Sequence, residues 1–378
     1  MKILFVATVR SHVGQFHMPF IRHLTELGHE VHAAFRDNSA DKQGLDLSVI
    51  HKTFEIPFER SPLKVNNIKA YFALKKVIDS GDYDVIHCHT PMGAVITRLA
   101  AGAARKRGAK VFYTAHGFHF YKGASRKNWL LFYPVEKLLA PRADVLITIN
   151  QEDHDLAVRK KFRAGRILRI NGVGVDLSKF SPATGAEKLR ARRELGLSEK
   201  QFVMLYAADL SKRKNQGMLF RALHRLRDQI PDACLLLPGQ PILQKEYEEQ
   251  CAQLGITGQV RFLGYRRDID RLLAACDCVV SSSRQEGLPI NLIEAAARGK
   301  YIIATDVRGN GDVVRQCGFG AVVKLNDDAA MASAICEFYG RGCPVNNDTS
   351  ATKVYDQSAI IDELLEIYGI SDKNGDKK

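Results

Sequence analysis

The sequence predicts an α/β protein made of two Rossmann-like domains, each built on a doubly wound parallel sheet. Its 378 residues are enough for two hydrophobic cores. Short β-branched runs alternate with amphipathic stretches, which is the β-α-β pattern of a parallel sheet. The alternation is interrupted near residues 175–186 and then returns. Because such domains bind ligands at the carboxyl ends of their strands, polar motifs at those points are the candidate sites.

The first domain is expected to span residues 1–178. Its strands are predicted at residues 2–8, 30–35, 84–87, 110–114, 145–149 and 167–170. Its helices are predicted at residues 18–27, 67–80, 93–107, 128–140 and 152–161. The polar stretch that follows contains Pro182 and Gly185, which break regular structure and mark the boundary between the domains.

The second domain is expected to span residues 179–357. Its strands are predicted at residues 202–207, 233–237, 260–262, 278–281, 301–304 and 321–323. Its helices are predicted at residues 216–229, 245–254, 268–275, 290–298 and 329–339. Residues 358–378 are expected to form a last helix that crosses back to the first domain, followed by a polar tail.

The composition narrows the partners and the compartment. A net charge of +13 predicts a polyanionic partner, either anionic lipid or a phosphorylated substrate, although a generally basic surface explains it too. Nucleic acid is not expected, because no binding motif accompanies the charge. No apolar run has transmembrane length, and the N-terminal residues resemble a strand rather than a signal peptide. The eight cysteines lie scattered without a C-x-x-C pair, which indicates a reducing, cytoplasmic setting.

The strongest motif follows the predicted strand at 278–281. Its sequence from residue 281 to residue 300 is SSSRQEGLPINLIEAAARGK. Glu286 and Gly287 lie in a loop, Pro289 suits the first helical position, and Glu294 lies about one and a half turns later. The free N–H groups of a helix start attract anions, and carboxylates accept hydrogen bonds from sugar hydroxyls. The alternatives are a charge offsetting the helix dipole at Glu286 and a solvated helix face at Glu294.

Four further motifs follow strands. Lys212, Arg213 and Lys214 precede a helix, which suits a diphosphate, although a solvated basic turn is an equal alternative. His116 follows another strand and could hydrogen-bond a sugar or a phosphate. Taken alone it would be a satisfied loop histidine, but its place at the carboxyl end of a strand favours the functional interpretation. The remaining candidates are His12, Gly14 and His17 in the loop after the first strand, and Gly309 and Gly311 in a loop able to form an anion-binding nest.

Glu286 and Glu294, with Gly287 and Pro289 between them and strands on both sides, resemble the E-x7-E motif of the family 4 retaining glycosyltransferases. This resemblance covers nearly the whole chain. It implies the GT-B architecture, in which two Rossmann-like domains face each other, with the acceptor on the first and the nucleotide-sugar donor on the second. It places Glu286 at the donor sugar and phosphate and Glu294 at the ribose hydroxyls.

The resemblance also assigns the other motifs. Lys214 matches the pyrophosphate lysine, and His116 the histidine near the donor sugar, so that His116, Glu286 and Lys214 are the expected catalytic residues. The family often has an arginine at the position of Asp209, which leaves Arg213 as its candidate substitute. The other expected donor-binding residues are Glu294, Gly287, Leu288, Pro289, Gly309 and Gly311. The acceptor-side candidates are His12, Gly14 and His17.

The function that the resemblance implies is retaining transfer of a hexosyl or N-acetylhexosaminyl group from a UDP-sugar, or less readily a GDP-sugar. The acceptor is expected to be a hydroxyl of a lipid-linked glycan in surface polysaccharide synthesis. No cofactor and no metal are expected, because Asp277 lacks a second aspartate at the spacing of a D-x-D motif.

The basic first domain, with the aromatic segment at 127–139, suggests peripheral binding to the inner face of an anionic membrane, unless Trp129 and Phe132 belong to a core helix. Three other functions remain open. A UDP-sugar 2-epimerase has the same fold, and a non-catalytic sugar-nucleotide or lipid-binding subunit would also retain a binding cleft. An NAD-dependent dehydrogenase is disfavoured because the loop after the first strand lacks the glycine fingerprint.

Overall fold

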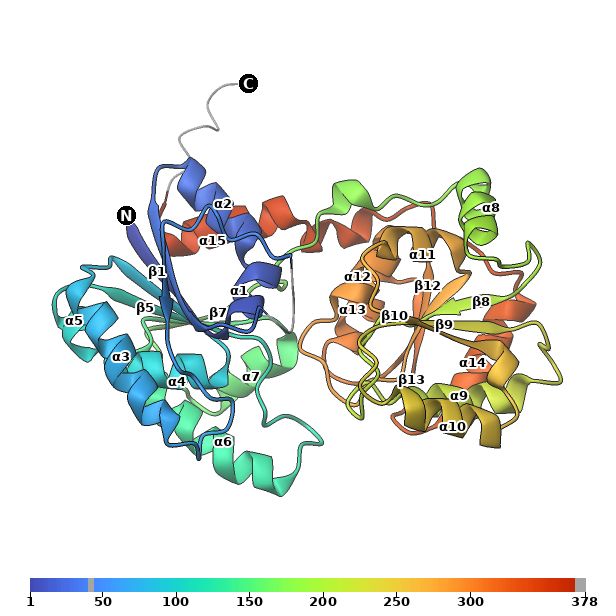
Figure 1. Cartoon of the computed structure of the whole chain (residues 1–378), viewed down its shortest axis with the longest axis horizontal. Helices are drawn as coiled ribbons and strands as arrows, with labels where there is room; N and C mark the ends of the chain where they lie inside the picture. The colour runs from blue at the N-terminus through green and yellow to red at the C-terminus, as the bar shows by residue number, and fades with distance from the viewer. Residues whose placement is uncertain (40–43, 371–378) are drawn as a thin grey trace. The chain divides into compact units, whose positions relative to one another are not determined.

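A computed structural model describes residues 1–39 and 44–370, which form two compact units (Figure 1). Unit 1 contains Met1–Gly174 and the C-terminal segment from Gln357. Unit 2 is the continuous stretch Val175–Asp356. Each unit has one parallel sheet with helices packed on it, so the predicted α/β class and the pair of Rossmann-like sheets are confirmed. Within the described residues, no helix combines the length and the apolar character needed to cross a lipid bilayer.

The sheet of unit 1 has seven strands in the order β3-β2-β1-β4-β5-β6-β7. These strands are β1 (Lys2–Val9), β2 (Glu30–Arg36), β3 (Lys52–Glu55), β4 (Val85–His89), β5 (Lys110–Ala115), β6 (Val145–Thr148) and β7 (Arg166–Arg169). The chain runs outward from β1 to β3 and then returns to place β4 on the other side of β1. A doubly wound sheet binds ligands at such a switch point, here at the ends of β1 and β4.

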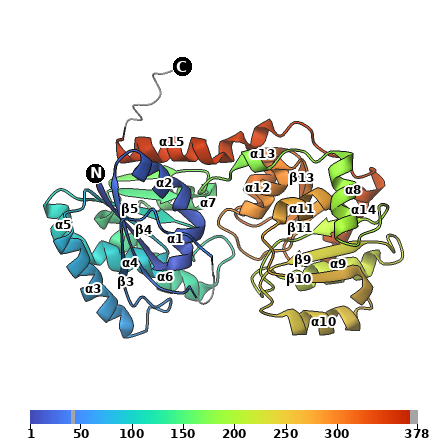
Figure 2. The same ribbon diagram turned by 45° about the horizontal axis from the view of Figure 1, so that its top comes forward.

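Helices cover both faces of this sheet. They are α1 (Arg10–Phe16), α2 (Met18–Glu26), α3 (Asn66–Ser80), α4 (Pro91–Ala100), α5 (Gly102–Lys106), α6 (Arg126–Leu139), α7 (Gln151–Arg159) and α15 (Gln357–Tyr368). Figure 2 shows α2 beside α15 on one face, and α4 contacts both α3 and α6 on the other. The central strands are buried on both faces, which explains their almost continuous apolar sequences.

Three local predictions for unit 1 are wrong. The helix expected at 93–107 is divided at Ala101 into α4 and α5, and the short edge strand β3 was not expected. The residues after β1 form helix α1 rather than a loop. Tertiary packing holds this helix, because a Cβ atom on Gly14 would lie 3.0 Å from the side chain of Leu45. The glycine therefore permits close packing here.

The sheet of unit 2 has six strands in the order β10-β9-β8-β11-β12-β13. They are β8 (Val203–Leu205), β9 (Cys234–Pro238), β10 (Val260–Gly264), β11 (Cys278–Ser281), β12 (Tyr301–Thr305) and β13 (Gly320–Val323). The helices are α8 (Gly185–Glu194), α9 (Gln216–Leu226), α10 (Gln244–Gln253), α11 (Ile269–Ala275), α12 (Ile290–Ala297), α13 (Asn310–Cys317) and α14 (Asp328–Gly340). Of these, α8 and α13 were not expected. The first and last residues of the unit are adjacent, since Val175 N–H donates to Tyr355 C=O at 2.9 Å.

Candidate active site

The candidate donor site of unit 2 lies where the loops after β8 and β11 meet. These two strands are neighbours, so their carboxyl ends share one edge of the sheet. Arg284 N–H donates to Arg213 C=O at 2.8 Å, and the Asn215 amide donates to Ser282 C=O at 3.1 Å. Asn215 has a left-handed backbone (φ of 58°), which asparagine tolerates better than most residues. These bonds hold the basic motif and the first glutamate of the acidic motif together.

Glu286 forms the centre of this site. Its carboxylate receives Lys214 Nζ on Oε1 at 2.7 Å and Arg213 Nη1 on Oε2 at 3.2 Å. The Ser283 hydroxyl donates to Oε1 at 2.5 Å. Burial alone would raise the pKa of Glu286, but the two cations and the hydroxyl lower it below its ordinary value. The carboxylate is therefore buried, ionised and held in one orientation.

The two cations differ in how firmly they are held. The side chain of Lys214 is 12% exposed and that of Arg213 is 50% exposed. Together they carry one more charge than the carboxylate that they contact, which leaves the site electropositive. Asp209 does not take part in this ion-pair group, because its side chain contacts the backbone N–H of Gln240 at 3.4 Å.

Glu294 lies on α12 in a different environment. Burial, and then the nearby charge of Asp270, raise the pKa of its carboxyl to about 7. Within residues 1–39 and 44–370, no side-chain or backbone group donates a hydrogen bond to this carboxylate. The Asn291 amide fixes α12 against the end of β8 by donating to Ala207 C=O at 3.2 Å. Glu294 is thus a largely buried carboxylate whose hydrogen-bonding capacity is open to a ligand.

The glycine motif is attached to the Glu286 loop. Arg308 Nε donates to Glu286 C=O at 2.9 Å. Gly309 precedes α13 with a φ of 81°, and a Cβ atom there would lie 2.6 Å from Gly287 C=O. Only glycine fits, because both the backbone conformation and the close approach exclude a side chain.

Three predicted residues take positions that differ in detail from the sequence analysis. Gly311 lies in the first turn of α13 rather than in a loop, because the helix begins at Asn310. Pro289 precedes the first residue of α12 and occupies its N-cap position. Leu288 packs against the core of unit 2.

The histidines of unit 1 form a second cluster. His12 lies on α1, His17 joins α1 to α2, and His116 follows β5. His89, the last residue of β4, completes the group. One ring nitrogen from each of the four lies within 4.8 Å of the others. The sequence analysis did not select His89, although it ends a buried strand in the same manner as the residues that were selected.

Burial dominates the electrostatics of this cluster. It lowers the pKa of His116 to about 4, and it lowers the pKa values of His12, His17 and His89 well below 6.5, with a further contribution from neighbouring histidines. The rings are therefore neutral at neutral pH. His119, by contrast, stacks on Phe132 with ring centroids 4.7 Å apart.

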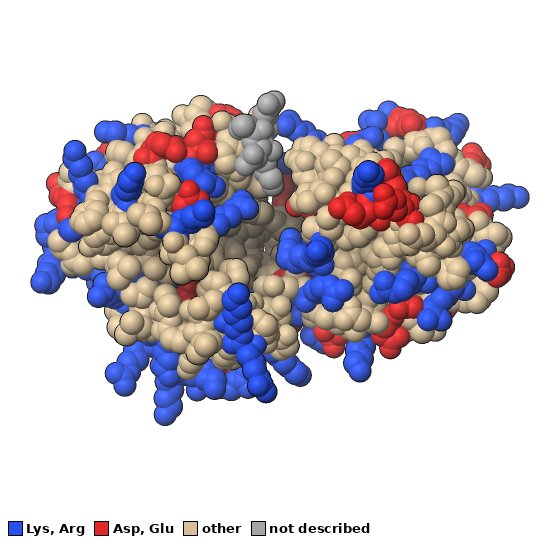
Figure 3. All heavy atoms as spheres, turned by 60° about the horizontal axis from the view of Figure 1, so that its bottom comes forward, with Lys and Arg blue, Asp and Glu red and all other residues tan. Residues whose placement is uncertain are grey.

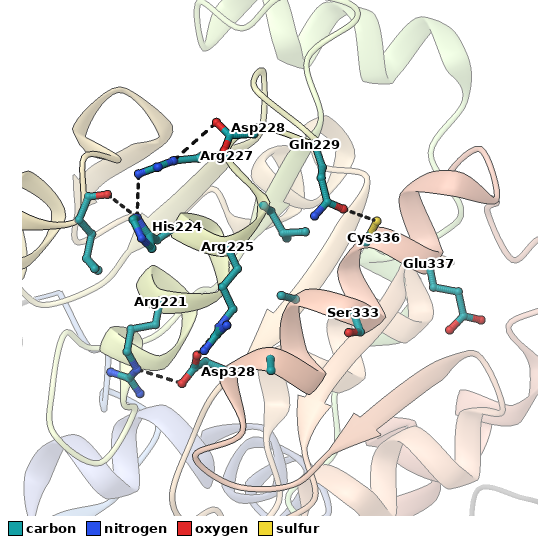
Figure 4. Close-up of a pocket in the computed structure, with 14 residues that line it drawn as sticks. Arg221, His224, Arg225, Arg227, Asp228, Gln229, Asp328, Ser333, Cys336 and Glu337 are labelled. Carbon is teal, nitrogen blue, oxygen red and sulfur yellow. Dashed lines mark hydrogen bonds and ion pairs between the residues drawn. The ribbon is translucent and has the colours of Figure 1, made fainter.

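A groove on unit 2 contains none of the predicted site residues. Its volume is about 940 Å³, and it lies between α9 and α14 (Figure 4). Arg221 and Arg225 line it and both pair with Asp328 (Figure 4). Because its cations are already paired within the protein, this groove is a poor candidate for the donor diphosphate.

The comparisons with known proteins decide the family. A family model described as "Glycosyl transferase 4-like domain" matches residues 13–171, and one described as "Glycosyl transferases group 1" matches residues 187–342. A Bacillus subtilis protein named as the glycosyltransferase EpsD is 39% identical, over 97% of this chain and 96% of its own. The chain belongs to the family 4 glycosyltransferases. It is an enzyme that transfers a glycosyl group, as the sequence motifs predict.

Other relatives of this glycosyltransferase have more specific names. An Escherichia coli protein, 28% identical over 72% of this chain and 70% of its own, is named UDP-Gal:alpha-D-GlcNAc-diphosphoundecaprenol alpha-1,3-galactosyltransferase. A Campylobacter jejuni protein, 25% identical over 99% of this chain and 100% of its own, is named N,N'-diacetylbacillosaminyl-diphospho-undecaprenol alpha-1,3-N-acetylgalactosaminyltransferase.

Solved structures confirm the GT-B fold of the glycosyltransferase. Anabaena Alr3699/HepE, solved in complex with UDP and glucose, has a TM-score of 0.78 at 23% identity and covers 98% of this chain and 99% of its own. WaaG, a glycosyltransferase of lipopolysaccharide biosynthesis, has a TM-score of 0.72 at 15% identity and covers 97% of this chain and 99% of its own.

Proposed function

We propose that this glycosyltransferase moves a sugar from a UDP-sugar, with retention of anomeric configuration, to a hydroxyl of a lipid-linked glycan in exopolysaccharide synthesis. The observation that carries the proposal is the group formed by Glu286, Lys214 and Arg213 in unit 2, with the unpartnered Glu294 on the following helix. This combination offers positive charge for a diphosphate and a carboxylate for ribose hydroxyls.

Each residue has a role in the proposed reaction. As the bond between the sugar and the diphosphate breaks, negative charge grows on the leaving phosphate, and Lys214 with Arg213 stabilises it. Glu286 holds both cations in place and, being ionised, stabilises positive charge that develops on the sugar. Glu294 accepts hydrogen bonds from the ribose. Since the cations provide the charge, no divalent ion is required at the diphosphate.

The printed names of relatives support the substrate classes. The Anabaena structure holds UDP and glucose, and the Escherichia coli and Campylobacter jejuni relatives are named for diphosphoundecaprenol-linked acceptors and α-1,3 linkages. The relation to EpsD supports a place in exopolysaccharide synthesis.

The test is a panel of UDP- and GDP-sugars, each incubated with and without lipid-diphosphate-linked monosaccharides. We expect UDP release only from one UDP-sugar together with an acceptor, and the same anomeric configuration in donor and product by NMR. UDP release and a changed sugar without any acceptor would instead identify a 2-epimerase. Binding of UDP without turnover in the whole panel would identify a binding subunit.

An amphipathic surface of unit 1 supports membrane binding as part of this function. Helices α3 and α6 both pack against α4 and leave large apolar side chains in solvent. These are Ile68 and Phe72 on α3, 60% and 64% exposed, and Leu130 and Leu138 on α6, 76% and 78% exposed. Exposed cations share these helices, namely Lys69, Lys76, Arg126 and Lys127. Figure 3 shows Lys and Arg side chains gathered along one edge of unit 1.

We call these eight residues the α3–α6 surface and propose that it lies on anionic lipid. Apolar side chains would enter the headgroup region while the cations meet lipid phosphates. Trp129 and Phe132 do not belong to it, because both pack against the core of unit 1.

Vesicle sedimentation tests this proposal. Binding to phosphatidylglycerol vesicles should exceed binding to phosphatidylcholine vesicles and should weaken with salt. Leu130→Ser with Leu138→Ser should reduce it, whereas Ile242→Ser, at a site 64% exposed in unit 2, should not. Equal binding to both lipids, insensitive to salt, would remove the proposal.

A further inference from the structure

We propose that unit 1 binds one divalent transition-metal ion of the Zn²⁺ class through His12, His17, His89 and His116. This site belongs to unit 1, whereas the donor group belongs to unit 2, and it is additional to the proposed function. The residues come from three segments of the chain, which the fold brings together at the carboxyl ends of β1, β4 and β5.

The four rings are packed together. His17 and His89 stack with centroids 3.8 Å apart, and the centroids of His12 and His116 are 4.6 Å apart. Because an imidazole lone pair lies in the ring plane, the stacked rings of His17 and His89 would have to turn for both to reach one ion. Zn²⁺ binds four ligands tetrahedrally with nitrogen at about 2.0–2.1 Å, which sets ligand nitrogens roughly 3.4 Å apart. Since the four nitrogens already lie within 4.8 Å of one another, no pair needs to approach by more than about 1.4 Å.

Some ring nitrogens of the cluster have no hydrogen-bond partner within the described chain, and a bound metal ion would occupy them. Among the residues that the structure describes, the Nε2 atoms of His12, His17 and His89 are buried and have no hydrogen-bond partner. A buried polar atom left without a partner destabilises the fold. A small cavity of about 20 Å³ borders His17 and His89.

The adjacent His87 shows the contrast. Its Nδ1 lies 2.6 Å from the Tyr368 hydroxyl, and its Nε2 lies 2.8 Å from the Thr114 hydroxyl. Both nitrogens are therefore occupied by the protein. His87 is a structural residue of the sheet, whereas His12, His17 and His89 each keep an Nε2 atom without a partner among the described residues. His116 Nε2 lies 3.3 Å from His89 Nδ1, a contact that a bound ion would replace.

The chemistry of the cluster selects the class of ion. Each imidazole carries a ring nitrogen with a lone pair that can bind a metal ion, and the group of four contains only histidines. In the described part of the chain, no carboxylate joins the four histidines in this group. An all-nitrogen donor set suits Zn²⁺, Cu²⁺, Ni²⁺ or Co²⁺ and does not suit Mg²⁺ or Ca²⁺, which prefer oxygen.

A bound ion would link α1 to the end of the sheet. It would fix the ring of His116 by one nitrogen and leave the other nitrogen for a substrate. In this position the ion acts on the orientation of a histidine, whereas the diphosphate chemistry remains with the cations of unit 2.

The experiment uses the full chain, stripped with dipicolinate and then dialysed. Calorimetry with ZnSO₄ should show one site per chain, and Co²⁺ should give the intense visible absorption of a tetrahedral complex. His17→Gln and His89→Gln should each weaken Zn²⁺ binding by at least about tenfold. His51→Gln, an exposed histidine outside the cluster, and Cys336→Ser are matched controls and should bind as the unmodified protein does.

Circular dichroism of the metal-free variants distinguishes loss of the metal site from loss of the fold. If His17→Gln and His89→Gln both unfold, His12→Asn on the short helix α1 is tested instead. The proposal is overturned if the unmodified chain binds no Zn²⁺, if folded cluster variants bind as tightly as the controls, or if either control loses the ion. It is also overturned if the stripped cluster binds inorganic pyrophosphate in place of metal. None of these measurements uses sugar transfer, so this proposal and the proposed function can fail separately.

Discussion

Replacing Glu294 by glutamine should weaken the binding of free UDP and change how that binding depends on pH. The reason is the carboxyl pKa of about 7 in a site where no described residue donates to it. In the proposed donor complex, ribose hydroxyls donate to the ionised carboxylate, so UDP binding is expected to favour ionisation and to lower this pKa. Affinity should therefore increase as pH rises toward 7 and level off above it.

The magnitude follows from the size of the shift. Each pH unit below the free pKa of about 7 costs up to tenfold in affinity, so the change between pH 8 and pH 5.5 approaches roughly 30-fold. The free energy that links UDP binding to the ionisation of Glu294 is limited by the difference between the raised pKa of about 7 and the ordinary pKa of 4.5. At about 1.4 kcal/mol per unit this is at most about 3.5 kcal/mol, and the remaining exposure of the carboxyl reduces it.

The same pKa shift predicts that the stability of the folded protein changes with pH in the opposite direction to UDP affinity. The folded state holds a proton on Glu294 that the unfolded state has lost between pH 4.5 and about 7, so this residue lowers stability as pH rises through that window. Glu294→Gln should therefore raise the melting temperature at pH 8 and leave it nearly unchanged at pH 4.5.

Calorimetry with UDP from pH 5.5 to pH 8.5 measures the affinity. The terminal phosphate of UDP also titrates near pH 6, so the glutamine variant supplies the correction for the ligand itself. Glu286→Gln is the matched comparison. We expect it to leave UDP affinity nearly intact and to slow transfer, because it pairs with the two cations proposed to stabilise the leaving phosphate.

Two results would refute this reasoning. If the unmodified enzyme and Glu294→Gln show the same pH dependence, Glu294 does not bind the nucleoside. If Glu286→Gln loses UDP while Glu294→Gln binds it normally, the two glutamates have been assigned the wrong way round.

Three other predictions concern the donor site. Lys214→Ala should lower donor affinity and kcat together by roughly tenfold to a hundredfold, because a charged contact contributes about 1.5–3 kcal/mol. Arg213→Ala should lower them less, because the Arg213 side chain is 50% exposed. An equal loss in both variants would contradict this ranking. Added Mg²⁺ or Mn²⁺ should change kcat less than about twofold in enzyme supplied with Zn²⁺. The reason is that each cationic side chain at the leaving phosphate contributes about 1.5–3 kcal/mol without a divalent ion. An absolute requirement for either ion would disprove metal-free leaving-group chemistry. Gly309→Ala should reduce UDP affinity, as measured by calorimetry, because its Cβ atom would meet Gly287 C=O at 2.6 Å, whereas Gly258→Ala, at an open position, should not.

The fold was largely predictable because buried parallel strands have apolar sequences that stand out from the helices around them. The errors occurred where local sequence is not decisive. Helix α1 contains Gly14 and depends on packing under Leu45, which comes from a distant part of the chain. Strand β3 is short and mostly exposed, so it lacks the pattern of a buried strand.

The candidate site was predictable in its residues and less so in their contacts. The sequence placed Glu286 and Lys214 after two different strands, but their ion pair depends on β8 and β11 being neighbours in the sheet. The different environments of Glu286 and Glu294 could not be inferred, since both are glutamates of one motif. His89 was missed because no motif around it resembles a known site, and only the fold places it beside His17.

The order in which the two units can complete their folding during synthesis follows from the division of the chain into units. Unit 2 is one uninterrupted stretch whose two ends meet, so it can fold as soon as Asp356 has left the ribosome. Unit 1 begins first but is completed last, because α15 comes at the end and its Tyr368 hydroxyl contacts the buried His87 at 2.6 Å. During translation, the nascent first unit must therefore wait, with part of its hydrophobic interior uncovered, until the whole of the other unit has been made.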